Sequence, residues 1–172
     1  QNIEDLQREY DQLGASAKAM KLTRQVVERL DEMAAFAPGK KAPDFTLPTP
    51  EGDSLSMYSI QGKVKILDFW ASWCAPCRGG IPGIKELYKK YAGENFEVVS
   101  VAVWDERAAT LKALEEEQMP WPQIIDAQEI PSNIYGFTGI PQVILFSPDG
   151  TIIARDLHGK AIDEAVEKAL KK

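Results

Sequence analysis

Apolar residues recur along the first 36 residues of the chain at spacings typical of a helix. Ile3, Leu6, Tyr10, Leu13, Ala17 and Met20 alternate spacings of three and four, and Val26, Val27, Leu30 and Met33 continue an apolar face. No proline interrupts the pattern before Pro38, so it predicts one long helix, or two that meet at Gly14. An amphipathic arm packed on its own domain is favoured over a coiled-coil dimer, because Arg24 falls on the simplest heptad continuation.

A short segment without apolar periodicity follows this arm. Residues 37–43 (APGKKAP) contain two prolines and a glycine, a composition typical of a linker. We therefore predict a helical arm over residues 1–37 and a separate domain over residues 38–172.

After the linker, strand and helix patterns alternate. Strands are predicted at residues 45–47, 54–57, 64–70, 96–103, 123–125, 142–146 and 152–157, and helices at 76–91, 106–118, 129–135 and 161–170. The first two strands flank a turn at 49–53 and the last two flank 147–150 (SPDG), so each pair predicts a hairpin. Strand–helix–strand units require parallel pairing, and the late hairpin adds an antiparallel edge. The predicted fold class is α/β, with a central mixed sheet flanked by helices.

Charge and composition narrow the possible partners. Twenty basic and 26 acidic residues give a net charge of −6, which argues against nucleic acid or an anionic membrane surface as the main partner. No apolar run approaches the roughly 18 residues of a membrane-spanning helix. No signal segment, with basic residues followed by apolar ones, opens the chain, but a mature form would lack such a segment in any case. The run Glu115-Glu116-Glu117 is predicted to be a solvated helix face.

The chain has only two cysteines, Cys74 and Cys77, separated by two residues. This count excludes a disulfide scaffold, and closing so short a loop contributes only about 2 kcal/mol. A chain of this size does not need that stabilisation, so the pair is predicted to carry chemistry. A structural zinc site is not expected, because the pair and the distant His158 cannot supply four ligands. His158, the only histidine, is predicted to be neither ligand nor catalyst.

The position of the pair predicts how the two sulfurs differ. A buried strand runs into Cys74 and a helix begins there, so unpaired N–H groups and the helix dipole favour a thiolate. Pro76 suits the first helical turn, and Arg78 adds positive charge nearby. Cys77, one turn into the helix, lies within bonding reach of Cys74. We predict an exposed sulfur of low pKa at Cys74 and a sheltered resolving sulfur at Cys77.

Residues 68–78 (DFWASWCAPCR) resemble the thioredoxin superfamily. Residues 73–78 with Ile81-Pro82, and the preceding 42–47 (APDFTL), are similar to the TlpA/ResA branch of extracytoplasmic thiol–disulfide oxidoreductases. The resemblance runs from about Ala42 to the C-terminus. It implies a thioredoxin fold with an N-terminal β-hairpin, to which the helical arm is extra, and a redox-active Cys74–Cys77 disulfide that needs no cofactor. The chain departs from the branch at Gly80, where a glutamate is common.

The same resemblance implies further site residues. At 138–141 (TGIP) it implies a cis bond before Pro141 and a backbone at Ile140 that pairs with an extended substrate chain. Trp73 is predicted to face the substrate, and Ala75 and Pro76 are included in the predicted substrate-binding set. The resemblance also gives Asp68 the role of a general base and acid for Cys77.

Asp68 interrupts an apolar strand, where a carboxylate is costly unless it is paired. Thioredoxins often carry a lysine on the neighbouring strand, but residues 96–104 contain none. We therefore expect Asp68 to be buried without a cationic partner and its pKa to be raised by desolvation. The alternative is an aspartate held by backbone or water hydrogen bonds at the strand's edge.

The predicted activity is thiol–disulfide exchange with substrate proteins, in the reducing direction, with no nucleic acid as partner. Electrons come from an upstream thiol reductant, for which a membrane-bound protein is one candidate. The resemblance implies a periplasmic or cell-envelope location with a membrane anchor, rather than the cytoplasm. Two alternatives are a peroxiredoxin-like peroxidase, which the residues Leu67 and Ala71 disfavour because that mechanism needs proline and threonine there, and a non-catalytic interaction module. The substrate and the oligomeric state stay open.

Overall fold

The computed structural model describes residues 11–12, 14–60 and 62–171, and the chain divides into two compact units, Gln1–Ala35 and Phe36–Lys172. In the first unit, helix α2 spans Ala15–Ala35. It begins directly after Gly14, the predicted weak point, and several of its apolar side chains are exposed: Met20, Leu22, Val26 and Val27. The predicted packing of this arm stays a prediction. Among the described residues, no helix is both long and apolar enough to cross a bilayer.

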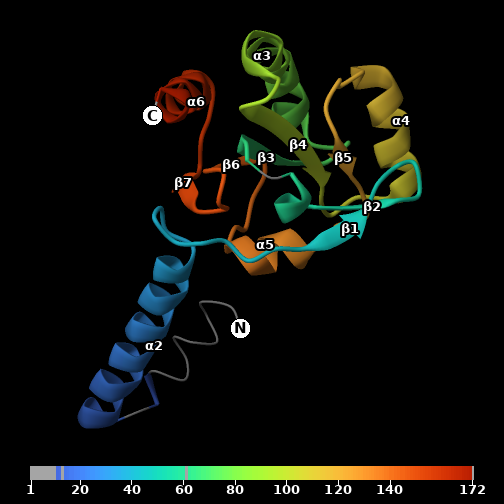
Figure 1. Ribbon diagram of the computed structural model, residues 1–172. Helices are drawn as coiled ribbons and strands as arrows, with labels where there is room; N and C mark the ends of the chain where they lie inside the picture. Colours follow the sequence, from blue (N-terminus) through green and yellow to red (C-terminus); the bar gives the residue numbers. More distant parts are fainter. Residues whose placement is uncertain (1–10, 13, 61, 172) are drawn as a thin grey trace. The chain divides into compact units, whose positions relative to one another are not determined.

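The second unit has the predicted alternation of strands and helices (Figure 1). Its strands are β1 (Thr46–Pro48), β2 (Ser54–Ser56), β3 (Val64–Trp70), β4 (Phe96–Ala102), β5 (Gln123–Ile124), β6 (Gln142–Phe146) and β7 (Ile152–Ala154). Its helices are the 3₁₀ turn η1 (Met57–Ser59), α3 (Ala75–Tyr91), α4 (Arg107–Glu117), α5 (Ile130–Tyr135) and α6 (Lys160–Leu170).

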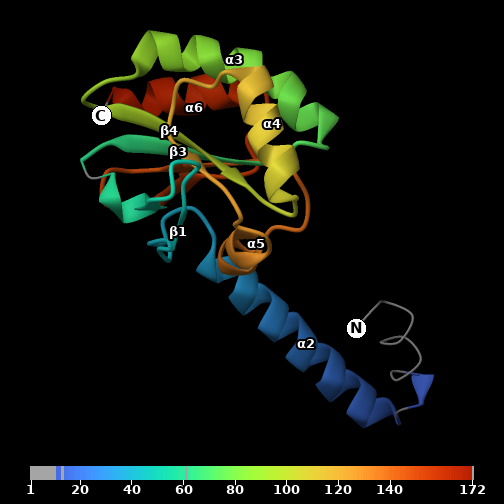
Figure 2. The same cartoon turned by 90° about the vertical axis from the view of Figure 1, so that its right-hand side faces the viewer.

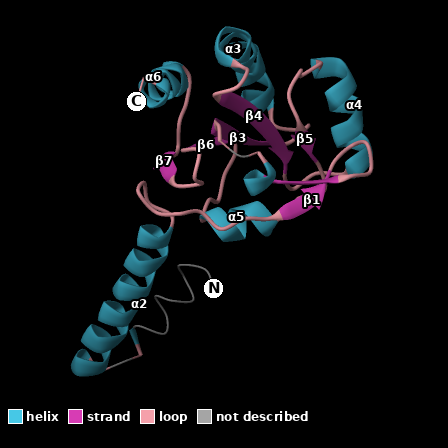
Figure 3. Ribbon diagram, in the orientation of Figure 1, coloured by secondary structure: helices cyan, strands magenta, loops and turns pink. Residues whose placement is uncertain are grey.

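Five strands form one mixed sheet in the order β5-β4-β3-β6-β7, and β1 and β2 form a separate antiparallel hairpin. Strand β3 pairs parallel with β4 and antiparallel with β6, so the predicted α/β class with a mixed central sheet is confirmed. Helices α3 and α6 lie side by side on one face, and α5 lies on the other (Figures 2 and 3).

The side chains of β3 alternate between these two faces, because successive residues of a strand point in opposite directions. Val64 and Ile66 pack in the core under α3 and α6, whereas Leu67 and Phe69 pack in the core that includes α5. All seven residues of β3 are buried, as predicted for a strand covered on both faces. Because β3 is held on both faces, its end at Trp70 fixes where the loop that leads to Cys74 begins.

The last strand is shorter than predicted. It ends at Ala154 instead of Leu157, and two residues later Asp156 has a positive φ of 54°. The Asp156 amide donates to the Gln142 side chain at 3.0 Å, so a side chain takes the place of a backbone partner and the regular strand pairing stops here. Apolar residues alone did not indicate this departure, because it depends on a side chain from β6.

Candidate active site

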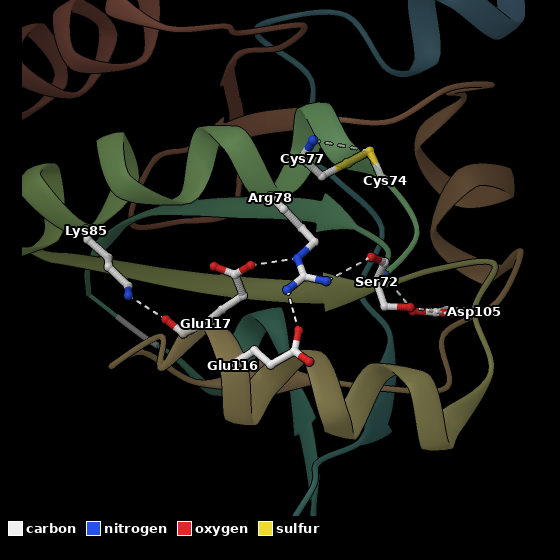
Figure 4. Close-up of polar contacts among 8 residues, drawn as sticks. All are labelled: Ser72, Cys74, Cys77, Arg78, Lys85, Asp105, Glu116 and Glu117. Carbon is white, nitrogen blue, oxygen red and sulfur yellow. Dashed lines mark hydrogen bonds and ion pairs between the residues drawn. A yellow bond between two sulfur atoms is a disulfide. The ribbon is translucent and has the colours of Figure 1, made fainter.

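The two cysteines form a disulfide at the junction of β3 and α3, with their Cα atoms 5.2 Å apart (Figure 4). Cys74 is the N-cap of α3, and its Sγ accepts a hydrogen bond of 3.2 Å from the Cys77 amide. Pro76 lies in the first helical turn, where its missing N–H costs nothing. The predicted placement of Cys74 at a helix N-terminus is therefore confirmed, and the amide that would stabilise a thiolate already points at its sulfur.

The two cysteines are equally buried in this disulfide form, at 4% exposure each. The prediction of an exposed Cys74 and a sheltered Cys77 is wrong for this state. Both residues pack in one small apolar cluster with Trp70, Ala102 and Ala113, which come from β3, β4 and α4. The sequence could not indicate that α4 contributes to this cover, because α4 lies some 30 residues along the chain.

Arg78 does not leave its positive charge free beside Cys74. Its guanidinium forms ion pairs of 2.6 Å with Glu116 and with Glu117 (Figure 4). These hydrogen bonds raise the pKa of Arg78 and lower the pKa of Glu116. Glu116 and Glu117 therefore hold the first turn of α3 to the last turn of α4. The prediction of a solvated face is confirmed for the exposed Glu115 and Glu116, but it missed the ion pairs and does not describe the partly buried Glu117.

A second carboxylate, Asp105, holds the loop that leads into Cys74. It accepts hydrogen bonds from the Ser72 amide at 2.7 Å and from the Ser72 hydroxyl at 2.9 Å. The Thr110 hydroxyl and the Glu106 amide, at 2.9 Å each, complete its contacts. Asp105 was not among the predicted site residues. Its signal was positional: it follows β4 just as the cysteine loop follows β3, and parallel neighbours end at the same sheet edge.

Trp73 is 59% exposed, and its indole N–H donates to the Trp104 carbonyl at 2.9 Å. Ala75 and Pro76 are exposed as well. These three residues therefore lie at the surface beside the disulfide, where a docking protein can reach them. Their predicted role in substrate binding stays a prediction.

The peptide bond between Ile140 and Pro141 is cis, as predicted. Ile140 packs against the cluster that contains both cysteines. Among the described residues, no hydrogen bond of the structure engages the Ile140 amide or carbonyl. This short backbone segment is thus free to pair with an extended chain.

A cavity of about 440 Å³ lies between α3 and α6 beside the disulfide. Four of the predicted site residues line it: Asp68, Pro76, Cys77 and Pro141. Much of the remaining wall is apolar, with Ile84, Leu87, Val143, Leu157 and Ile162, and His158 and Asp163 also contribute. Asp68 and Cys77 therefore line the same cavity. It also brings His158 to this site, which the sequence did not indicate.

Asp68 is 3% exposed in the middle of β3. Its Oδ2 accepts a hydrogen bond of 3.0 Å from the Ser100 hydroxyl on β4. Burial raises the pKa of Asp68 from 3.8 to about 7, and the Ser100 hydrogen bond opposes that rise. Among the residues that the structure describes, no lysine or arginine forms an ion pair with Asp68. A carboxyl with this pKa can take and return a proton near neutral pH.

The site brings together two kinds of reactive group. The two sulfurs can exchange electrons through thiol–disulfide chemistry, and the Asp68 carboxyl can exchange a proton. In the described part of the chain, no group of three or more His, Cys, Asp or Glu side chains is arranged to bind a metal ion.

The AhpC/TSA family model matches residues 38–155 of the chain. The thiol-disulfide oxidoreductase ResA of Bacillus thuringiensis subsp. konkukian is 30% identical over 134 residues, which cover 78% of this chain and 77% of that protein. The thioredoxin domain of a thiol-disulfide oxidoreductase from Bacteroides vulgatus matches with a TM-score of 0.71 and 30% identity, over 77% of this chain and 96% of that one. A thiol-disulfide oxidoreductase from Bacteroides fragilis matches with a TM-score of 0.69 and 32% identity, over 75% and 98%.

Proposed function

The chain belongs to the AhpC/TSA family and is a thiol–disulfide oxidoreductase of thioredoxin fold, and we propose that Cys74 and Cys77 carry its reaction with Asp68 as proton acceptor. The family, the fold and the class of activity agree with the sequence prediction, and the peroxidase and non-catalytic alternatives are not favoured. The observation that supports the proposed roles best is the position of Cys74 as the N-cap of α3, with an amide donor at its sulfur.

The reaction begins with the reduced protein, in which both cysteines carry thiols or thiolates. The Cys74 thiolate attacks one sulfur of a substrate disulfide, whose S–S bond breaks and releases a substrate thiolate. A mixed disulfide then joins Cys74 to the substrate. The helix N-terminus favours the attacking thiolate, because its unpaired N–H groups and dipole stabilise negative charge.

The second step releases the substrate. Asp68 takes the proton of the Cys77 thiol, and the Cys77 thiolate attacks the Cys74 sulfur. The mixed disulfide breaks, the second substrate sulfur leaves as a thiolate that takes the proton from Asp68, and the Cys74–Cys77 disulfide forms. The substrate thiolate released in the first step takes a proton from water. One substrate disulfide becomes two thiols, and an upstream thiol reductant then returns the two electrons to Cys74 and Cys77. The shared cavity of Asp68 and Cys77 supports this assignment.

We place the substrate chain along Ile140, whose free backbone groups allow it to pair as an added strand. Trp73, Ala75, Pro76 and Pro141 then form the surface around the reacting sulfurs, and no cofactor is required. The substrates are proteins with disulfides or thiols. The resemblance to extracytoplasmic oxidoreductases supports a periplasmic or cell-envelope location, with a membrane-bound protein as candidate reductant.

The experiment compares wild type with Cys74→Ser and Cys77→Ser in the reduction of insulin disulfides. Wild type is expected to reduce insulin, and both variants are expected to lose turnover. Only Cys77→Ser should accumulate a mixed disulfide with the substrate, which mass spectrometry detects, because its Cys74 attacks but nothing resolves the product. Turnover by Cys74→Ser equal to that of wild type would contradict the proposal, and trapping by Cys74→Ser alone would reverse the two roles.

A further inference from the structure

Ser100 occupies the position directly beside Asp68 in the sheet. The two residues are register partners in the parallel pair of β3 and β4. Ser100 is fully buried, and its hydroxyl is the only hydrogen-bond donor to the Asp68 side chain among the described residues. A neutral hydroxyl on the neighbouring strand, and no cation among the described residues, therefore holds this carboxylate.

A third residue fixes the direction of that hydroxyl. The indole N–H of Trp121, 3% exposed, donates to Ser100 Oγ at 2.8 Å. A serine hydroxyl has one proton to give, and here it has two acceptors within reach: Asp68 Oδ2 at 3.0 Å and Met119 Sδ at 3.8 Å. When Asp68 is ionised, the proton points to the carboxylate. When Asp68 is protonated, the hydroxyl can turn to Met119 and accept the proton of Asp68 instead.

We propose that Ser100 is a positioning residue that, with Trp121 behind it, holds the Asp68 carboxylate and sets the pH range in which Asp68 takes the proton of Cys77. This inference rests on the proposed role of Asp68. It adds two residues to the machinery that touch neither substrate nor reacting sulfur. The indole N–H strengthens the effect, because a hydroxyl that accepts one hydrogen bond becomes a better donor in the next.

Among the groups around Asp68, Ser100 is the one that stabilises its ionised form. The cavity in front of Asp68 contains the titratable residues Cys77 on α3, His158 before α6 and Asp163 on α6. The strand partner on β6, Val143, carries no titratable group. Burial raises the pKa of Asp68, and the opposing effect comes from Ser100 alone.

The test measures the pKa of Asp68 by carboxyl NMR in the disulfide form, with Asp68→Asn to assign the resonance. In Ser100→Ala we expect this pKa to rise by about one unit, the size of one hydrogen bond to a charged group. Turnover at pH 7 should fall about fivefold as the ionised fraction drops. Ser100→Thr, which keeps the hydroxyl, should restore the wild-type value, and Trp121→Phe should shift it upward by less.

Two controls separate this effect from a loss of packing. Thr110→Val removes another buried hydroxyl that donates to a carboxylate, that of Asp105, and should not move the pKa of Asp68. In the Asp68→Asn background, Ser100→Ala should cause no further loss of turnover. If Ser100→Ala does not fold, Trp121→Phe compared with the wild type still tests the upward shift of the Asp68 pKa.

An unmoved Asp68 pKa in both Ser100→Ala and Trp121→Phe overturns the inference, as does an equal loss of turnover when Asp68 is already asparagine. Neither result contradicts the proposed exchange reaction, which is tested separately by the trapping experiment with Cys77→Ser. If that trapping fails while the Asp68 pKa moves as expected, the proposed exchange scheme is wrong. The conclusion that Ser100 and Trp121 hold the Asp68 carboxylate is then still supported.

Discussion

The two sides of the disulfide hold their carboxylates in different ways. On the side of α4, Asp105 accepts four hydrogen bonds, and Glu116 and Glu117 are paired with Arg78. On the side of α6, the buried Asp68 has one neutral donor and faces a cavity. A carboxylate surrounded by donors fixes geometry, because its lone pairs are occupied. A buried carboxylate with one neutral donor exchanges its proton near neutral pH, because its charged form is poorly compensated.

This difference assigns a task to each side of the site. The α4 side determines where the loop before Cys74 lies, through contacts with its backbone and side chains. In the proposed mechanism, the α6 side takes the proton of Cys77. Both tasks use an aspartate: Asp68 lies in the middle of β3, and Asp105 follows the neighbouring strand β4. Only the groups around each carboxylate distinguish them.

The largest expected effect concerns stability as a function of pH. The folded pKa of Asp68, about 7, lies above its ordinary value of 3.8, so the folded state binds the proton more tightly than the unfolded state. Asp68 therefore reduces stability as pH rises from about 4 to about 7, by about 4 kcal/mol in total. Denaturant unfolding of the oxidised protein across this range should show the loss, and Asp68→Asn should remove it.

The exposed carboxyl of Asp53 serves as the matched control. Asp53→Asn should leave the pH dependence of the wild type unchanged. A flat profile in the wild type, or the same slope in Asp68→Asn, would mean that Asp68 is not the buried proton acceptor that distinguishes the α6 side.

An intermediate effect is expected on the α4 side. Asp105→Ala leaves the Ser72 amide and the Ser72 hydroxyl without their acceptor, at a cost of about 2 kcal/mol in the free energy of unfolding. Asp105→Asn should cost less, because one oxygen remains. Denaturant midpoints report the loss, and it should be independent of pH between 6 and 8, unlike the effect of Asp68→Asn. A pH-dependent loss would make the two sides alike.

The smallest effect should come from Arg78. Its charge is already balanced by Glu116 and Glu117, so Arg78→Gln should change the alkylation rate of reduced Cys74 by less than about threefold, because a partly exposed ion pair is screened by solvent. The double variant Glu116→Gln, Glu117→Gln frees that charge and should lower the pKa of Cys74. A tenfold loss of reactivity in Arg78→Gln would show that Arg78 activates the thiolate despite its partners.

Local features of the sequence were sufficient for most of the fold. The apolar run 64–70 and the turn at 147–150 predicted β3 and the final hairpin, because burial on both faces and turn geometry depend on nearby residues. The shorter β7 was not predictable in this way, since the Asp156 amide donates to the Gln142 side chain instead of to a backbone carbonyl of β6. The ion pairs of Glu116 and Glu117 also depend on a distant residue and were not predicted. Their partner is Arg78, which lies 38 residues before Glu116 in the chain.

The sequence by itself determined that a strand meets a helix at two cysteines, and therefore that one sulfur lies at a helix N-terminus. It also determined that an aspartate interrupts an apolar strand. Only the tertiary structure decided which groups surround these residues: two glutamates for Arg78, Asp105 for the cysteine loop, and Ser100 with Trp121 for Asp68. Backbone conformation follows from neighbours in the chain, whereas the pKa of a buried group depends on every atom packed around it.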